Sequence, residues 1–92
     1  MALRRQNAAT VTFIMAGLML AATLCEVGIT SEAELMAARN LEHARPFFDR
    51  AARLAQITPM TKTEQRTFTA GCEHARVRLL ELSELLYRLA ER

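Results

Sequence analysis

The sequence predicts an all-α fold, in which an N-terminal apolar helix is followed by an antiparallel helical hairpin with a proline-kinked first arm. Three observations support this prediction. Of the 92 residues, 51% are apolar, while only three are Gly and two are Pro, a composition that favours helices over strands. Apolar residues recur at steps of three and four along the later segments, which is typical of helices. Two capping-box spacings predict where helices begin.

The first predicted helix contains a run without charge, residues 8–25, although the chain as a whole is 24% charged. A helix of this length rises about 27 Å, close to the roughly 30 Å of a bilayer's hydrocarbon layer. Apolar side chains lie on all its sides, which favours a membrane over a small soluble bundle, where each helix keeps a face in water. We expect a membrane anchor with these lipid contacts: Val11, Phe13, Ile14, Leu18 and Leu20.

The flanks of the run fit either a retained anchor or a cleaved signal. Arg4 and Arg5 precede it, and no acidic residue occurs before Glu26, as in a positive-inside flank or the start of a secretory signal. Cleavage after Ala22 would place Leu20 where signal peptidases require a small residue. We therefore expect a retained single-pass anchor in the bacterial or mitochondrial inner membrane.

A second helix is predicted after Gly28, which we expect to cap the first helix, because Ser31 and Glu34 have capping-box spacing. Pro46 lies inside this helix, where it predicts a kink; the alternative is a break, with a new helix opening at Phe47. One apolar seam runs along the segment: Ala37, Leu41, Ala44, Phe48, Ala51 and Ala55.

Thr58 and Pro59 end the second predicted helix, and Thr61 with Glu64 begins a third. Its seam is complete: Phe68, Cys72, Ala75, Leu79, Leu82, Leu86 and Leu89. The short connection predicts that the two helices are antiparallel and that their seams pack on each other. Residues 1–30 are thus the predicted anchor and connector, and residues 31–92 the predicted interaction domain.

Apolar residues outside the third seam predict a protein partner. Leu80, Leu85 and Tyr87 widen the apolar face beyond what two helices can cover, so we expect them to contact another protein.

Charge and motifs argue against several function classes. Two of the 12 basic residues precede the run, and the remaining ten are balanced by ten acidic residues. The rest of the chain therefore has no net positive charge that would attract nucleic acid. Cys72 and His74 are two residues apart and point to different helix faces, which disfavours a metal site, and Cys25 and Cys72 are not placed for a disulfide. With no glycine loop, nucleophile elbow or paired carboxylates, we expect no catalysis, cofactor or small-molecule substrate.

These observations lead us to expect a non-enzymatic, membrane-anchored protein that serves as an accessory or assembly subunit of a larger membrane protein complex. One alternative is a soluble helical adaptor or chaperone, whose first helix packs on the hairpin and brings Leu80 or Leu85 against Met15 or Leu18. Another is a periplasmic or secreted regulator, with a mature chain that begins near Thr23.

Overall fold

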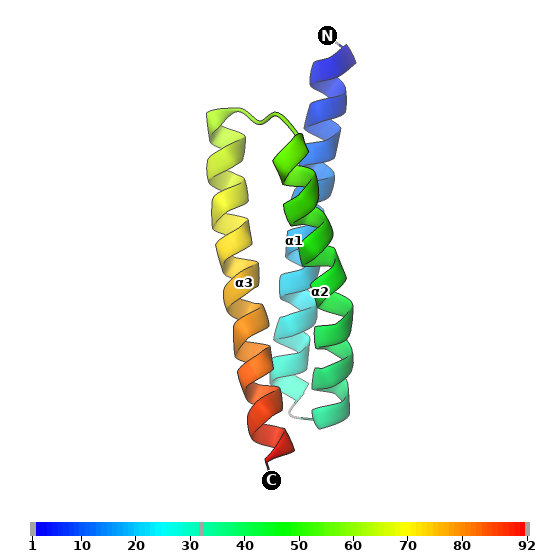
Figure 1. The fold of residues 1–92 in the computed structure, drawn as a ribbon, viewed down its shortest axis with the longest axis vertical. Coiled ribbons are helices and arrows are strands. Elements are labelled where there is room, and N and C mark those ends of the chain that lie inside the picture. Colours follow the sequence, from blue (N-terminus) through cyan, green and yellow to red (C-terminus); the bar gives the residue numbers. More distant parts are fainter. Residues whose placement is uncertain (1, 32, 92) are drawn as a thin grey trace.

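The computed structural model describes residues 2–31 and 33–91, which form three helices packed side by side in a bundle of 56 × 18 × 18 Å (Figure 1). The helices are α1 (Ala2–Ser31), α2 (Glu34–Ile57) and α3 (Lys62–Ala90). Each runs antiparallel to the one before it, so the start of α1 and the end of α3 lie at opposite ends of the bundle (Figure 1). The all-α prediction, with a long apolar first helix and a helical hairpin, is confirmed.

The start of α3 is the one that the sequence predicts. The Thr61 hydroxyl accepts a hydrogen bond from the Glu64 amide at 3.1 Å, and the Glu64 carboxylate accepts one from the Thr61 amide at 2.8 Å. This reciprocal pair satisfies two amide donors that the first turn of a helix leaves free.

The predicted capping box at Ser31 and Glu34 is wrong. Ser31 is still part of α1, and its hydroxyl donates to the Gly28 carbonyl at 2.9 Å. The N-cap of α2 is Ala33, which makes no side-chain capping bond. The spacing was misleading because a hydroxyl within a helix can bond back to its own preceding turn.

Gly28 does not end α1, so the predicted C-cap is wrong as well. It is buried inside the helix, where a Cβ would lie 3.0 Å from a methyl of Leu82 and 3.3 Å from the Cβ of Asn40. A side chain would not fit without displacing these neighbours. The glycine therefore serves close helix packing rather than chain reversal.

The core lies where all three helices meet, because α1 packs against both arms of the hairpin. The two seams face inward, with Ala37, Ala44, Ala75 and Leu82 fully buried, but they pack largely against α1 rather than mainly on each other as predicted. The buried side chains form two clusters along the bundle, each containing residues of α1: Ala21, Cys25, Ala37, Leu41, Ala44 and Leu82 in one, and Ile14, Leu18, Ala22, Ala51 and Ala75 in the other. Most of these side chains are alanine, which lets the helices approach closely.

Pro46 lies within α2, which is continuous from Glu34 to Ile57. The alternative of a helix break at this position is therefore wrong. Pro46 is exposed, whereas Ala44 two residues earlier is buried, so the ring occupies the solvent face and leaves the seam unbroken. The kink itself stays a prediction.

Candidate functional site

The predicted anchor residues divide between two faces of α1. Val11, Ile14 and Leu18 are buried against the hairpin, at 7%, 0% and 2% exposure, whereas Phe13 and Leu20 are 55% and 43% exposed on the opposite side. Sequence periodicity could not separate the two groups, since both faces of the helix are apolar. The structure thus assigns the first three side chains to the core of the bundle and leaves the other two free for an external contact.

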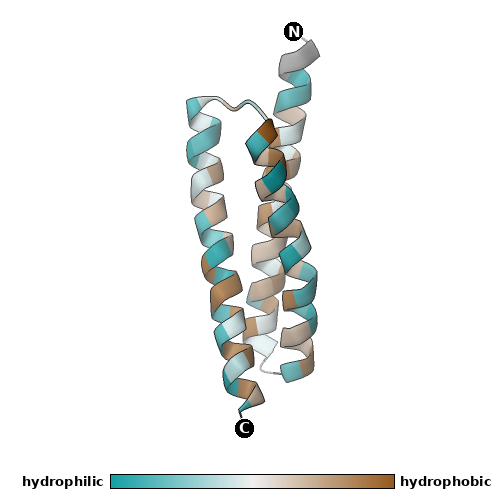
Figure 2. Cartoon of the chain, viewed as in Figure 1, coloured by the Kyte–Doolittle hydropathy of each residue, from teal (hydrophilic) through white to brown (hydrophobic). Residues whose placement is uncertain are grey.

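The exposed side of α1, which we call the outer face, carries no charge along its central five turns. Its exposed residues are small or apolar: Ala8, Ala9, Thr12, Phe13, Ala16, Met19, Leu20 and Thr23. Figure 2 shows pale to brown colours along the middle of α1, while teal recurs along α2 and α3. A solvated helix face normally carries charged or strongly polar side chains, so this surface is the main candidate for an interaction.

The hydroxyls in the first half of α1 are satisfied within the helix. Thr10 donates to the Gln6 carbonyl at 2.9 Å, and Thr12 donates to the Ala8 carbonyl at 3.0 Å. These bonds lower the cost of removing both hydroxyls from water, because each already has an acceptor. Thr12, which belongs to the outer face, can therefore enter an apolar environment without leaving its hydroxyl unpaired.

In length and composition, α1 qualifies as a membrane span. Within the described residues, one helical segment, Arg5–Ser31, is long and apolar enough to cross a bilayer. A third of its most apolar stretch is buried inside the bundle. A core helix of a soluble protein and a signal sequence share these properties, so the span alone does not identify a membrane protein.

A shallow depression of about 130 Å³ lies where the outer face meets α2. Phe13, Gly17 and Leu20 line it from α1, and Phe47 and Arg50 line it from α2. Pockets that enclose small molecules usually measure about 300–1,000 Å³. This depression therefore extends the outer face as a contact surface and is too small to hold a metabolite.

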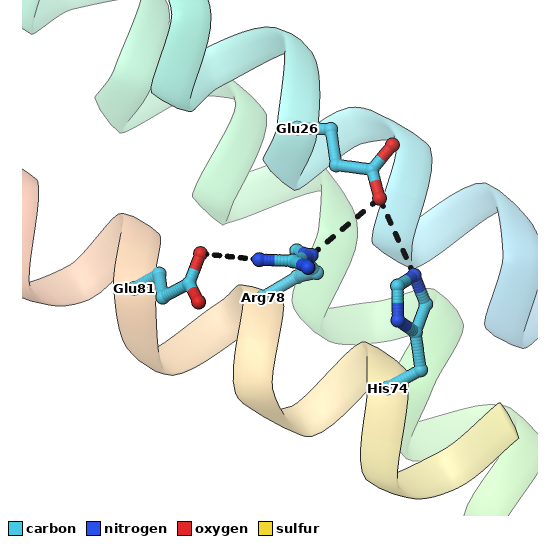
Figure 3. Close-up of polar contacts among 4 residues, drawn as sticks. All are labelled: Glu26, His74, Arg78 and Glu81. Atoms are coloured by element: carbon cyan, nitrogen blue, oxygen red, sulfur yellow. Dashed lines mark hydrogen bonds and ion pairs between the residues drawn. The ribbon is translucent and has the colours of Figure 1, made fainter. Parts of the chain in front are cut away.

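Glu26 connects α1 to α3 at the end of the uncharged run (Figure 3). Its Oε1 lies 3.3 Å from His74 Nε2 and 3.5 Å from Arg78 Nε, while Arg78 donates a hydrogen bond to Glu81. The side chains of His74 and Glu26 are each about half exposed, at 53% and 49%. Exposed pairs of this kind contribute about 0–1 kcal/mol, so these contacts add little to the stability of the bundle.

Arg78 is the most buried member of this cluster, with a side-chain exposure of 32%. Its buried Nε has no hydrogen-bond acceptor among residues 2–31 and 33–91, since the contact with Glu26 is ionic and lacks hydrogen-bond geometry. Glu26 is recognisable in the sequence only as the first charged residue after the run. Its partners could not be predicted, because they depend on α1 packing against α3.

Asn40 of α2 makes the second polar contact with α1. Its side chain is 6% exposed, and its Nδ2 donates to the Leu24 carbonyl at 2.8 Å. The acceptor is a carbonyl inside α1, and the bond satisfies a buried amide that would otherwise destabilise the core. Sequence reasoning missed this residue, which lies one position before the seam residue Leu41.

The predicted partner interface lies on α3, largely in solvent. Leu80 and Tyr87, seven residues apart on one helix face, are 59% and 67% exposed, and Leu85 is half-buried. The expected contact of Leu80 or Leu85 with Met15 or Leu18 is wrong, since Met15 and Leu18 pack with a different part of α3: Phe68, Cys72 and Ala75.

The described residues include no group of three or more His, Cys, Asp or Glu side chains that could hold a metal ion. Cys25 is a buried free thiol and Cys72 a half-buried one. Comparison of the chain with protein families, curated proteins and solved structures finds no match.

Proposed function

We propose that the protein is a non-enzymatic, membrane-associated helical subunit, in which α1 contacts the bilayer and the hairpin contacts a larger membrane protein complex. The observation that carries this proposal is the outer face of α1, which is exposed yet uncharged from Gln6 to Cys25. Charged residues flank this stretch at Arg5 and Glu26. A polar residue at each end of an apolar segment is the arrangement that positions a helix in a bilayer.

The second contact of this subunit is the exposed face of α3. Val77, Leu80 and Tyr87 occupy one side of the helix, at spacings of three and seven, and all three are exposed. The three side chains form a ridge, interrupted by the exposed Glu84 between Leu80 and Tyr87, that can fit a groove on another protein. An aromatic residue on such a ridge is a common anchor of protein interfaces. We place the complex, and this protein with it, in the bacterial or mitochondrial inner membrane.

A soluble adaptor or chaperone is the second candidate, and one observation favours it. The inner face of α1 is buried in the bundle, with Ile14, Ala21 and Cys25 all at 0% exposure. Charged side chains recur on the exposed faces of α2 and α3, whereas the outer face of α1 has none. In this candidate function, the outer face of α1 binds a protein instead of lipid.

Vesicle flotation of the full chain separates the two candidates. The chain, purified in mild detergent and diluted with preformed vesicles of phosphatidylcholine and phosphatidylglycerol, is expected to float with the lipid in a density gradient. The apolar outer face drives this partition, because it loses contact with water at about 25 cal/mol per Å². A chain that stays at the bottom of the gradient as a folded, helical monomer would contradict membrane association and support the adaptor.

A further inference from the structure

We infer that α1 exchanges between two environments, the three-helix bundle and the lipid bilayer, by separating from α2 and α3 while its C-terminal end stays close to them. The inference rests on the proposed membrane function and adds a conformational step to it. The partner of the released helix is lipid. Four features of the described residues lead to this conclusion.

The first feature is the position of the polar contacts that hold α1. Among residues 5–31 and 33–91, whose side chains the structure describes, every hydrogen bond and ion pair between α1 and the other helices involves Leu24 or Glu26: the bond from Asn40, and the ionic contacts with His74 and Arg78. All of them lie near the end of α1 that leads into α2 (Figure 1). The preceding five turns of α1 are held by apolar contacts alone.

The second feature is the nature of those apolar contacts. Val11, Ile14, Leu18 and Ala22 are buried against the hairpin. Their side chains are apolar, so contact with lipid tails can replace their contacts with the hairpin. Lipid tails remove such side chains from water as effectively as a protein core does. In the bilayer, the outer face would be covered as well, which the bundle does not achieve.

The third feature is the charge of α2, which lies beside α1 for most of its length (Figure 1). All of its charged side chains are exposed: Glu34, Arg39, Glu42, Arg45, Asp49, Arg50 and Arg53. Placing a charged residue at the centre of a membrane helix costs about 2.5–3.5 kcal/mol. The packed bundle therefore cannot span a bilayer as a unit, and a spanning α1 must leave α2 behind.

The fourth feature is the composition of the hairpin surface that α1 would uncover. Its most buried apolar side chains are four alanines and two leucines: Ala37, Leu41, Ala44 and Ala51 of α2, and Ala75 and Leu82 of α3. They belong to the two seams of α2 and α3, and these helices already contact each other in the bundle. Because the alanines allow a close approach, the two seams can pack more fully on each other after α1 departs.

A disulfide between α1 and α2 tests the inference directly. A Cβ placed on Gly17 lies 3.7 Å from the Cβ of Ala51, within the 3.5–4.5 Å range of Cβ separations in disulfides. The experiment uses the full chain with Gly17→Cys and Ala51→Cys in a background where Cys25 and Cys72 are replaced by alanine. Oxidised and reduced samples are incubated with vesicles of phosphatidylcholine and phosphatidylglycerol and then extracted with alkaline carbonate.

We expect the oxidised chain to crosslink in solution and to appear in the carbonate-resistant pellet at about one tenth or less of the reduced level, because a bilayer can capture only the released helix. Reduction should restore the pellet fraction. The Ala51→Cys variant in the same background serves as the control and should be insensitive to oxidation. Circular dichroism of both redox forms verifies that helix content is equal.

The outcomes separate this inference from the proposed function. If crosslinked and reduced chains both resist carbonate, α1 enters the membrane without release, and the inference is wrong while membrane association stands. If neither form nor the native chain resists carbonate or floats with lipid, the membrane function itself fails, and the inference with it. Failure of the two cysteines to crosslink in solution would contradict the packed position of α1.

Discussion

Replacing Met19 with arginine is expected to leave the bundle folded and to reduce its membrane-inserted fraction by about 100-fold, since an arginine at the centre of a spanning helix costs roughly 3 kcal/mol. Met19 is 71% exposed at the middle of the outer face, so in the bundle the new charge stays in water and changes the free energy of unfolding by no more than about 0.5 kcal/mol. Carbonate extraction measures insertion, and urea unfolding followed by circular dichroism measures stability.

The adjacent residue provides the matched control. Leu18 is 2% exposed in the core, and Leu18→Arg places an unpaired charge there, which costs several kcal/mol. We expect this variant to lose both the folded bundle and membrane insertion. If Met19→Arg partitions like the native chain while remaining folded, the outer face does not enter lipid, and the soluble adaptor is the better account.

Replacing Leu82 with alanine is expected to lower the free energy of unfolding by about 2–5 kcal/mol, the usual range for a leucine lost from a packed core. Leu82 is fully buried, and its methyl groups lie against the backbone of Gly28. The surrounding helices cannot collapse into the space that the side chain leaves, because α1 already approaches α3 closely at this point.

Leu80→Ala is the control for this substitution. Leu80 lies two residues away on the same helix and is 59% exposed, so its loss should change stability by no more than about 0.5 kcal/mol. Both free energies come from urea unfolding of the full chain followed at 222 nm. Equal effects of the two substitutions would show that α1 does not cover α3 in solution.

Much of this fold could be predicted because helical periodicity is a local property. The seams containing Ala44 and Leu82 were recognised from apolar steps of three and four, and they are buried. The start of α3 was predicted because a capping box consists of residues within one turn, Thr61 and Glu64. Pro46 did not prevent recognition of α2, since the seam keeps its phase on both sides of the ring.

The sequence-based predictions are wrong or incomplete where a residue's role depends on a helix that is distant in the sequence. A glycine after an apolar run is typical of a helix end. Gly28 instead lies inside α1, where Leu82, more than fifty positions later in the sequence, leaves no room for a side chain. The split of the apolar run into an inner face and an outer face likewise follows from the packing of α1. Glu26 could be singled out from the sequence, but its contacts with His74 and Arg78 required the structure.

Carbonate extraction of the native chain from the membranes of cells that express it, with the intact mass read from the same sample, tests the central claim most directly. We predict the full-length chain in the carbonate-resistant pellet, with α1 retained. The full-length chain in the supernatant would contradict the membrane function and support a soluble adaptor, and a chain that begins near Thr23 would show that the apolar run is a cleaved signal.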